Sequence, residues 1–344
     1  MHMNNSKLSI QNKFTSQTNA ALPVIMAPMF LVSNLAMIKS AMQNGIVGTF
    51  PTLNFREEGE LDSVLKELNN FSSQGTNMPS YGVNLIVQKT NPLYEKHLKI
   101  CIQCKVPFFI TSLGNPKDVI KLAHAYGAKV YCDVTNFEHA HKSASAGCDG
   151  FIAVGAGAGG HAGNIPLNVL VPALKKKYPE MPVMAAGGIS TGEGIASMLM
   201  LGADGASIGT RFIACDEAKV NDQYKTAIIN AGMEDLMLTT RLSGTPCNVI
   251  KTEDALRMGA EQNWFERLLN NNPKTKKYFK MLVQFKGMKK LEKAIKPGNY
   301  KNLWSAGMSV EFIDSEMSVA EIVKQLDKEL YETLKKSNNF IAAV

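Results

Sequence analysis

Short apolar runs rich in β-branched residues recur along the first two-thirds of the chain. Their first residues are 21 to 35 positions apart, which is the length that a strand, a helix and two loops require. The eight runs begin at Pro23, Ile46, Tyr81, Val106, Lys129, Gly150, Pro182 and Gly205. The pattern therefore predicts eight strands in regular βα alternation.

Segments with a polar and an apolar side separate these runs and predict helices. Three of them follow polar residues that commonly start helices, at Asn34, Asn115 and Thr191. The expected helices are residues 35–43, 61–71, 116–126, 137–146 and 193–201. Nearly continuous apolar strands indicate a parallel sheet covered on both faces. Eight such units favour a closed (β/α)8 TIM barrel in the α/β class. A doubly wound open sheet is the alternative, and the absence of GxGxxG after the first strand disfavours it.

The alternation stops after Arg211. Residues 213–302 are Lys-rich, Met-rich and helix-like, with no comparable strand, so we expect a helical insertion after the eighth strand. Residues 318–336 repeat apolar positions at helical spacing and predict the last barrel-covering helix. We therefore assign residues 1–212 and 303–344 to the barrel, and 213–302 to a lid domain over the barrel mouth, where barrel sites lie.

The composition is that of a globular protein, with 344 residues, 45% hydrophobic and 19% charged. The longest apolar run, residues 20–32, contains two prolines and is shorter than the ~18 residues of a transmembrane helix. The six cysteines show no disulfide framework. Cys101 and Cys104 form a lone CxxC, interpreted as two thiols on one buried helix turn rather than a zinc site. We expect a cytoplasmic protein with no metal, no membrane partner and no nucleic acid.

The net charge of +7 is unevenly distributed. Residues 251–301 contain 13 basic and 5 acidic side chains, a balance of +8, so the rest of the chain is about neutral. Such a segment attracts an acidic partner or a phosphorylated substrate, or is simply the solvated face of helices.

Two glycine-containing turns follow the seventh and eighth runs, at residues 185–190 (AAGGIS) and 207–211 (SIGTR). Glycine lets backbone N–H groups approach a phosphate, and the helix after Ser190 adds a favourable dipole. Barrels often bind phosphate at these two positions. The turns therefore predict a phosphate-binding cup.

A third glycine-rich turn, residues 155–163, follows the sixth run and contains His161. Glycines around one histidine let the backbone pass close to a flat ligand while presenting an imidazole at the barrel mouth. The other histidines, which fall at the terminus or on expected helices, are His2, His97, His124, His139 and His141. His161 is therefore the candidate catalytic residue.

Seven motifs in order resemble those of the nitronate monooxygenases, formerly called 2-nitropropane dioxygenases. They are MAPM (26–29), GVN (82–84), AGGHAG (158–163), AAGGIS (185–190), GASIGTRF (205–212), TTRLSG (239–244) and WSAG (304–307). The superfamily also contains flavin-dependent enoyl-acyl-carrier-protein reductases and NADH:quinone reductases.

The resemblance implies an FMN-dependent barrel enzyme whose active-site histidine, near flavin N5 and the substrate, is His161. It implies the following cofactor contacts: Gly187, Gly188, Gly209 and Thr210 at the phosphate; Met26, Ala27 and Asn84 at the isoalloxazine; and Gly159, Gly160 and Ser207 in the same turns. Two positions depart from the family pattern. Many relatives have Glu two residues before the Gly-Gly-His, where Gly157 stands here, and Gln is frequent at the position of Met26.

The leading functional hypothesis is oxidation of alkyl nitronates by FMN and O2, with a small-molecule substrate. His161 is either a base toward a neutral nitroalkane or a hydrogen-bond donor to the anion. The alternative is reduction of an enoyl thioester on an acidic carrier protein, which the +8 segment favours. A quinone reductase with NAD(P)H is a related alternative. A third class is a barrel that binds FMN or another phosphorylated ligand without turnover.

Overall fold

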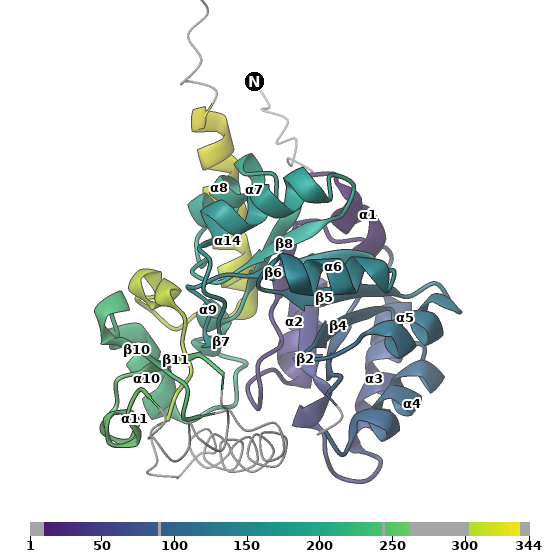
Figure 1. Cartoon of the computed structure of the whole chain (residues 1–344), viewed down its shortest axis with the longest axis horizontal. Coiled ribbons are helices and arrows are strands. Elements are labelled where there is room, and N and C mark those ends of the chain that lie inside the picture. The colour runs from purple at the N-terminus through teal and green to yellow at the C-terminus, as the bar shows by residue number, and fades with distance from the viewer. Residues whose placement is uncertain (1–9, 89–90, 243–244, 262–302, 338–344) are drawn as a thin grey trace, which may run out of the picture.

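The computed structural model describes residues 10–88, 91–242, 245–261 and 303–337. Eight parallel strands form a closed barrel in the order β1-β2-β3-β4-β5-β6-β8-β9 (Figure 1). Their bounds are β1 (Val24–Met26), β2 (Val47–Pro51), β3 (Gly82–Ile86), β4 (Phe108–Ser112), β5 (Lys129–Val134), β6 (Gly150–Val154), β8 (Val183–Ala186) and β9 (Gly205–Ile208). Each strand falls in one of the eight apolar runs, so the predicted TIM barrel is confirmed.

Helices follow the strands and cover the outside of the barrel. They are α2 (Leu35–Gln43), α3 (Glu60–Gln74), α4 (Tyr94–Gln103), α5 (Lys117–His124), α6 (Phe137–Ser145), α7 (Leu167–Lys177) and α8 (Gly192–Met200). The side chains of Asn34 and Thr191 cap α2 and α8 as expected, because each accepts a backbone N–H of the first turn. The last helix, α14 (Val319–Ser337), packs against α8 and α2, which confirms the predicted covering helix.

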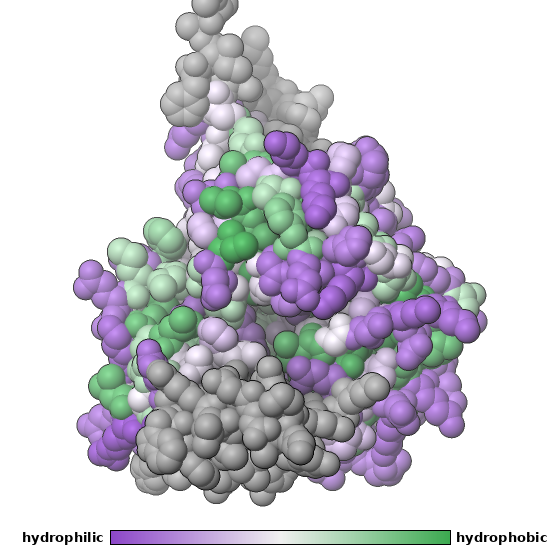
Figure 2. Space-filling view, viewed as in Figure 1, coloured by the Kyte–Doolittle hydropathy of each residue, from purple (hydrophilic) through white to green (hydrophobic). Residues whose placement is uncertain are grey.

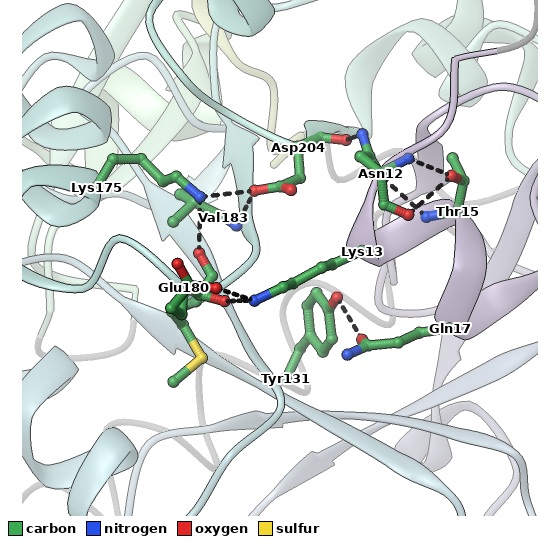
Figure 3. A network of polar contacts seen from close by, with 10 residues as sticks. Asn12, Lys13, Thr15, Gln17, Tyr131, Lys175, Glu180, Val183 and Asp204 are labelled. Atoms are coloured by element: carbon green, nitrogen blue, oxygen red, sulfur yellow. Dashed lines mark hydrogen bonds and ion pairs between the residues drawn. The ribbon is translucent and has the colours of Figure 1, made fainter.

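A short helix, α1 (Lys13–Thr18), closes the amino end of the barrel. The ring of Phe14 is fully buried and meets Phe108 and Tyr131 edge to face, with ring centroids 6.5 Å and 6.1 Å away. Polar contacts hold the helix in place (Figure 3): Asn12 Nδ2 donates to the Asp204 carbonyl at 2.7 Å, and Tyr131 Oη donates to Gln17 at 2.8 Å. The amino end of the barrel is therefore filled by side chains of α1 and the strands. A ligand site is expected at the carboxyl ends of the strands.

The segment after the eighth strand corrects one expectation. It contains α9 (Thr210–Ile213), α10 (Asp222–Asn230), η2 (Met233–Asp235), β10 (Leu236–Thr239), β11 (Cys247–Ile250) and α11 (Glu253–Met258). β10 and β11 pair antiparallel, and β11 pairs with β7 (Gly160–His161) from the barrel mouth. In Figure 1 this group lies to one side of the barrel. The prediction of a strandless helical segment over 213–302 is therefore wrong for its described part, and residues 262–302 lie outside the described residues.

The two strands escaped prediction because four residues are too few for a period to be recognised, and because β11 completes its sheet with a distant strand. The chain returns through η3 (Met308–Phe312) to α14. In the described residues, no helix is long and apolar enough to cross a membrane. Figure 2 shows hydrophilic side chains over much of this face and an apolar patch near α7 and α8. Val169 of α7 and Met200 of α8 are exposed.

All six cysteines lie in the described part of the chain; they are buried and form no disulfide with one another. Cys101 lies on α4 and Cys104 follows its last residue, so the CxxC does occupy one buried helix end. Within the described ranges, no group of three or more His, Cys, Asp or Glu residues could hold a metal ion.

Candidate active site

A cavity of about 1610 Å³ opens at the carboxyl ends of the barrel strands. Its walls contain ten of the eleven predicted site residues: His161, Ala27, Asn84, Gly159, Gly160, Gly187, Gly188, Ser207, Gly209 and Thr210. These residues come from turns that are far apart in the sequence. The barrel therefore brings together the glycine turns and the histidine that the sequence singled out.

Met26 is the exception. Its side chain is fully buried in the core between the barrel strands and the outer helices, and it does not line the cavity. Successive side chains of a strand point to opposite faces, and in β1 it is Ile25 that points into the barrel. The substitution of Met for the frequent Gln therefore removes no side chain from the cavity wall.

The turn after β8 has the geometry of an anion cradle. Gly187 and Gly188 have φ of +118° and +74°, and a Cβ at Gly187 would lie 2.6 Å from the amide nitrogen of Ala158. In the described residues, the backbone N–H groups of Gly187, Gly188 and Gly209 donate to no protein acceptor. Unpaired N–H groups at the wall of a cavity need an acceptor from a ligand or from water. These turns therefore fit a phosphate group.

The N-terminus of α8, which we expected to contribute its dipole to phosphate binding, contacts protein groups instead. The first N–H of α8, at Gly192, donates to the Glu329 carboxylate of α14 at 2.8 Å, and Gly194 donates to Thr191 at 3.1 Å. The N-terminus of α8 is therefore capped by the protein itself. The cradle relies on loop amides instead.

Residues 304–308 clamp the glycine-rich turn that carries His161. The Gly307 N–H donates to Thr210 Oγ1 at 3.0 Å, and the Met308 N–H donates to the Gly157 carbonyl at 3.0 Å. A Cβ at Gly307 would lie 2.7 Å from that carbonyl oxygen and 2.8 Å from the amide nitrogen of Gly159. Only glycine fits between the cradle and the histidine turn at this distance.

Asn248 holds the same turn from the other side. It is 2% exposed, and its Nδ2 donates to the carbonyls of Ala156 at 3.1 Å and Ala158 at 2.8 Å. Asn248 could not be predicted from the sequence, because its partner turn lies about 90 positions away and no local signal connects the two.

His161 lies in β7, where its backbone pairs with Cys247 of β11. The His161 side chain is exposed to the cavity, and the surrounding cavity walls desolvate the imidazole enough to lower its pKa below the ordinary value. The neutral imidazole is therefore the dominant form at neutral pH. A neutral imidazole has one nitrogen that accepts a proton and one that donates a hydrogen bond.

The sequence did not predict that polar side chains of β3, β4 and β5 form a hydrogen-bonded row in the cavity wall. Asn84 Nδ2 donates to Ser112 Oγ at 2.6 Å, and Ser112 Oγ donates to Asp133 Oδ2 at 2.5 Å. Burial raises the pKa of Asp133 to about 6, against the lowering effect of the Ser112 hydrogen bond. An aspartate inside the apolar run of β5 was the signal that could have found this residue.

Gly157 and His139 also line the cavity. A Cβ at Gly157 would lie 3.2 Å from the Cα and nitrogen of Gly188, so a Glu at this position would press on the cradle. His139 of α6, which was not chosen as a site residue because it falls on an expected helix, lines the cavity and contacts Thr135 Oγ1 through Nδ1 at 3.0 Å. The position where many relatives have Glu is therefore one at which two glycine turns, those of Gly157 and Gly188, lie in close contact.

Comparison with known proteins gives the class of the chain. A nitronate monooxygenase family profile matches residues 56–329, and the chain belongs to this family. It is therefore an oxidoreductase of a family of flavin enzymes. A nitronate monooxygenase of Paraburkholderia phytofirmans is 29% identical over 231 residues, which cover 65% of this chain and 60% of that protein.

Other relatives carry different names. The (3aS,4S,5R,7aS)-5-hydroxy-7a-methyl-1-oxo-octahydro-1H-indene-4-carboxyl-CoA dehydrogenase of Mycobacterium tuberculosis is 28% identical over 263 residues, covering 75% of this chain and 72% of that protein. The structure of FabK from Thermotoga maritima superposes with a TM-score of 0.82 at 27% identity, over 97% of this chain and 100% of that one. A nitroalkane oxidase from Streptomyces ansochromogenes has the same fold, with a TM-score of 0.77 at 23% identity and coverage of 95% and 100%.

Proposed function

We propose that the protein binds FMN in this cavity and oxidises alkyl nitronates with O2. The observation that carries the proposal is the position of His161, a histidine with a lowered pKa in the wall of the cavity that also holds the unpaired amides of Gly187, Gly188 and Gly209. An anion cradle and a neutral imidazole in one cavity suit a phosphorylated cofactor and a substrate that exchanges a proton.

The residues present fit FMN at both of its ends. The amides of Gly187, Gly188 and Gly209 would hold the phosphate, and Ala27 and Asn84 would contact the ring. When bound, FMN supplies the electron transfer between substrate and O2, and the protein supplies position and charge. The apolar barrel interior below the cavity, with Ile110 and Ile152, excludes water from that contact.

His161 acts on the substrate rather than on the phosphate. Toward a neutral nitroalkane, the unprotonated nitrogen of the imidazole accepts the proton from the carbon next to the nitro group. Toward a nitronate anion, the N–H of the same ring donates a hydrogen bond to a nitro oxygen. The pairing of β7 with β11 and the hydrogen bonds of Asn248 hold the backbone of the turn that carries His161.

Reduction of an enoyl thioester is the second candidate. The cavity volume of about 1610 Å³ exceeds the ~300–1,000 Å³ typical of small-ligand pockets, and its walls include Met29, Phe30 and Leu93. Such a cavity has room for a long acyl chain beside the cofactor. The acidic carrier protein of this reaction would meet the basic segment 251–301, most of which lies outside the described residues.

Steady-state assays of the purified, FMN-reconstituted protein distinguish these functions. One assay follows O2 consumption with an alkyl nitronate, and the others follow NAD(P)H oxidation with an enoyl thioester or a quinone. Nitronate-dependent O2 uptake without NAD(P)H supports the proposal. Turnover of the thioester alone would replace the proposed reaction, and a colourless protein that takes up no FMN would contradict both enzymatic functions.

A further inference from the structure

We propose that Asp133 sets the reduction potential of the bound flavin by placing a carboxylate beside the end of the cofactor that lies across the cavity from the phosphate cradle. The inference rests on the flavin binding of the proposed function. It goes beyond that function because it assigns an electrostatic role to a residue that the reaction itself does not require.

The barrel order places the row of Asn84, Ser112 and Asp133 on strands that do not carry the cradle. Around the closed barrel, β3 and β4 each lie three or four strands away from β8 and β9, which carry the cradle. β5 is next to β4 and lies two strands from β8 and three from β9. Asn84, Ser112 and Asp133 belong to β3, β4 and β5, and all three line the cavity. A ligand with a phosphate at one end and a heterocycle at the other therefore spans from the cradle to this row.

The hydrogen bonds of the row leave oxygen atoms available to such a ring. Asn84 donates a hydrogen bond to Ser112, and the single hydroxyl proton of Ser112 is donated to Asp133 Oδ2. All hydrogen bonds of the row therefore run from Asn84 toward Asp133. Among the described residues, no donor reaches Asn84 Oδ1 or Asp133 Oδ1. The pyrimidine edge of a flavin presents an N–H between two carbonyls, and an acceptor oxygen suits that N–H.

No ion pair balances the charge of Asp133 within the described residues. The two charged or titratable side chains of the neighbouring helix α6 that line the cavity have other partners: Lys142 pairs with Glu138 at 2.5 Å, and His139 contacts Thr135. The remaining titratable groups in the cavity wall are Arg56, His161, Tyr224, Cys132 and Cys247. Strands β4 and β6, which flank β5, contribute no charged side chain to the wall.

The sign of the effect follows from Coulomb's law. Reduction adds negative charge to the ring system, so an ionised carboxylate nearby opposes it and a protonated one does not. At an effective dielectric constant of about 20, two unit charges about 10 Å apart interact by more than the energy of a tenfold change in an equilibrium constant. Because the pKa of Asp133 is raised to about 6, the carboxylate is ionised at pH 8 and mostly protonated at pH 5.

The test compares midpoint potentials of the flavin in the wild type, Asp133→Asn and Asp118→Asn at pH 8 and pH 5. Asp118 is an exposed carboxylate on α5, so its variant controls for the loss of one charge outside the cavity. We expect Asp133→Asn to favour the reduced flavin about tenfold or more at pH 8, which for a two-electron couple is about 30 mV. The difference should disappear at pH 5, and Asp118→Asn should change the equilibrium less than twofold.

A second variant guards against misfolding of the first. Ser112→Ala removes the hydrogen bond that lowers the pKa of Asp133, so the pH at which the potential changes slope should move upward. Equal potentials in flavin-loaded wild type and Asp133→Asn at pH 8 would overturn the inference and leave the proposed function intact. The same holds if Asp133→Asn changes KM alone, because the carboxylate then faces the substrate. Failure of the wild type to bind flavin would overturn both.

Discussion

Substitution of Gly307 by Ala tests whether residues 304–308 position the catalytic turn. The new Cβ would lie 2.7 Å from the Gly157 carbonyl oxygen, whereas ordinary contacts begin at 3.4 Å, so the two segments must separate by about 0.7 Å. Both neighbours are backbone atoms, which cannot rotate away. Overpacking of this kind costs about 1–3 kcal/mol. For 344 residues, this lowers the unfolding midpoint by roughly 1–4 °C.

The effect on turnover should be larger than the effect on stability. A misplacement near 1 Å of groups that touch the reacting atoms costs about 10²-fold, so we expect kcat to fall about 10- to 100-fold in Gly307→Ala. The assay is O2 uptake with nitronate, with flavin affinity and thermal unfolding measured on the same samples.

Gly232→Ala is the matched control. Gly232 starts η2 with φ −89° and ψ 171°, close to the φ −98° and ψ 167° of Gly307 at the start of η3. A Cβ at Gly232 would meet the end of the Glu311 side chain at 3.2 Å, which has room to move. If both variants keep wild-type kcat and flavin affinity, the clamp has no role in positioning His161 and the reasoning is refuted.

Three further outcomes follow from the geometry. Gly188→Val should weaken FMN binding in a fluorescence titration far more than the exposed Gly127→Val, because both have positive φ but only the first Cβ enters the cradle. Asn248→Ala should lower the free energy of unfolding by about 1–3 kcal/mol in urea, since it loses two buried hydrogen bonds; an unchanged value contradicts this. Flavin-free Asp133→Asn should have a higher free energy of unfolding than the wild type at pH 8 and an equal one at pH 4. The reason is that the folded-state pKa of Asp133 is raised to about 6, so the cost of burying its charge disappears on protonation. A difference in the free energy of unfolding that does not change with pH would contradict this.

The sequence predicted the barrel well because its signals are local and repeated. Each apolar run needs only its own residues to form a strand between helices, and the Asn34 and Thr191 caps act within one helical turn. The glycine turns were also visible, since left-handed backbone at Gly188 requires glycine wherever the turn lies.

The features that were missed depend on contacts between distant segments. β10 and β11 are strands because they pair with each other and with β7, and Asn248 matters because of a turn about 90 residues earlier. Met26 was assigned to the ring because the sequence of a strand buried on both faces does not say which side chains face inward. Asp133 lay in a run classified as a strand by its apolar neighbours, and only the closed barrel places it beside Ser112.

The central claim is that His161 exchanges a proton with the substrate in a cavity whose flavin is held by other residues. The most direct test measures O2 uptake by flavin-loaded His161→Ala with a neutral nitroalkane and with its preformed nitronate. We expect a loss of about 10²–10⁴-fold on the nitroalkane, a smaller loss on the nitronate, and unchanged FMN affinity. Wild-type rates on both substrates would contradict the account, because His161 would then be a structural residue of β7.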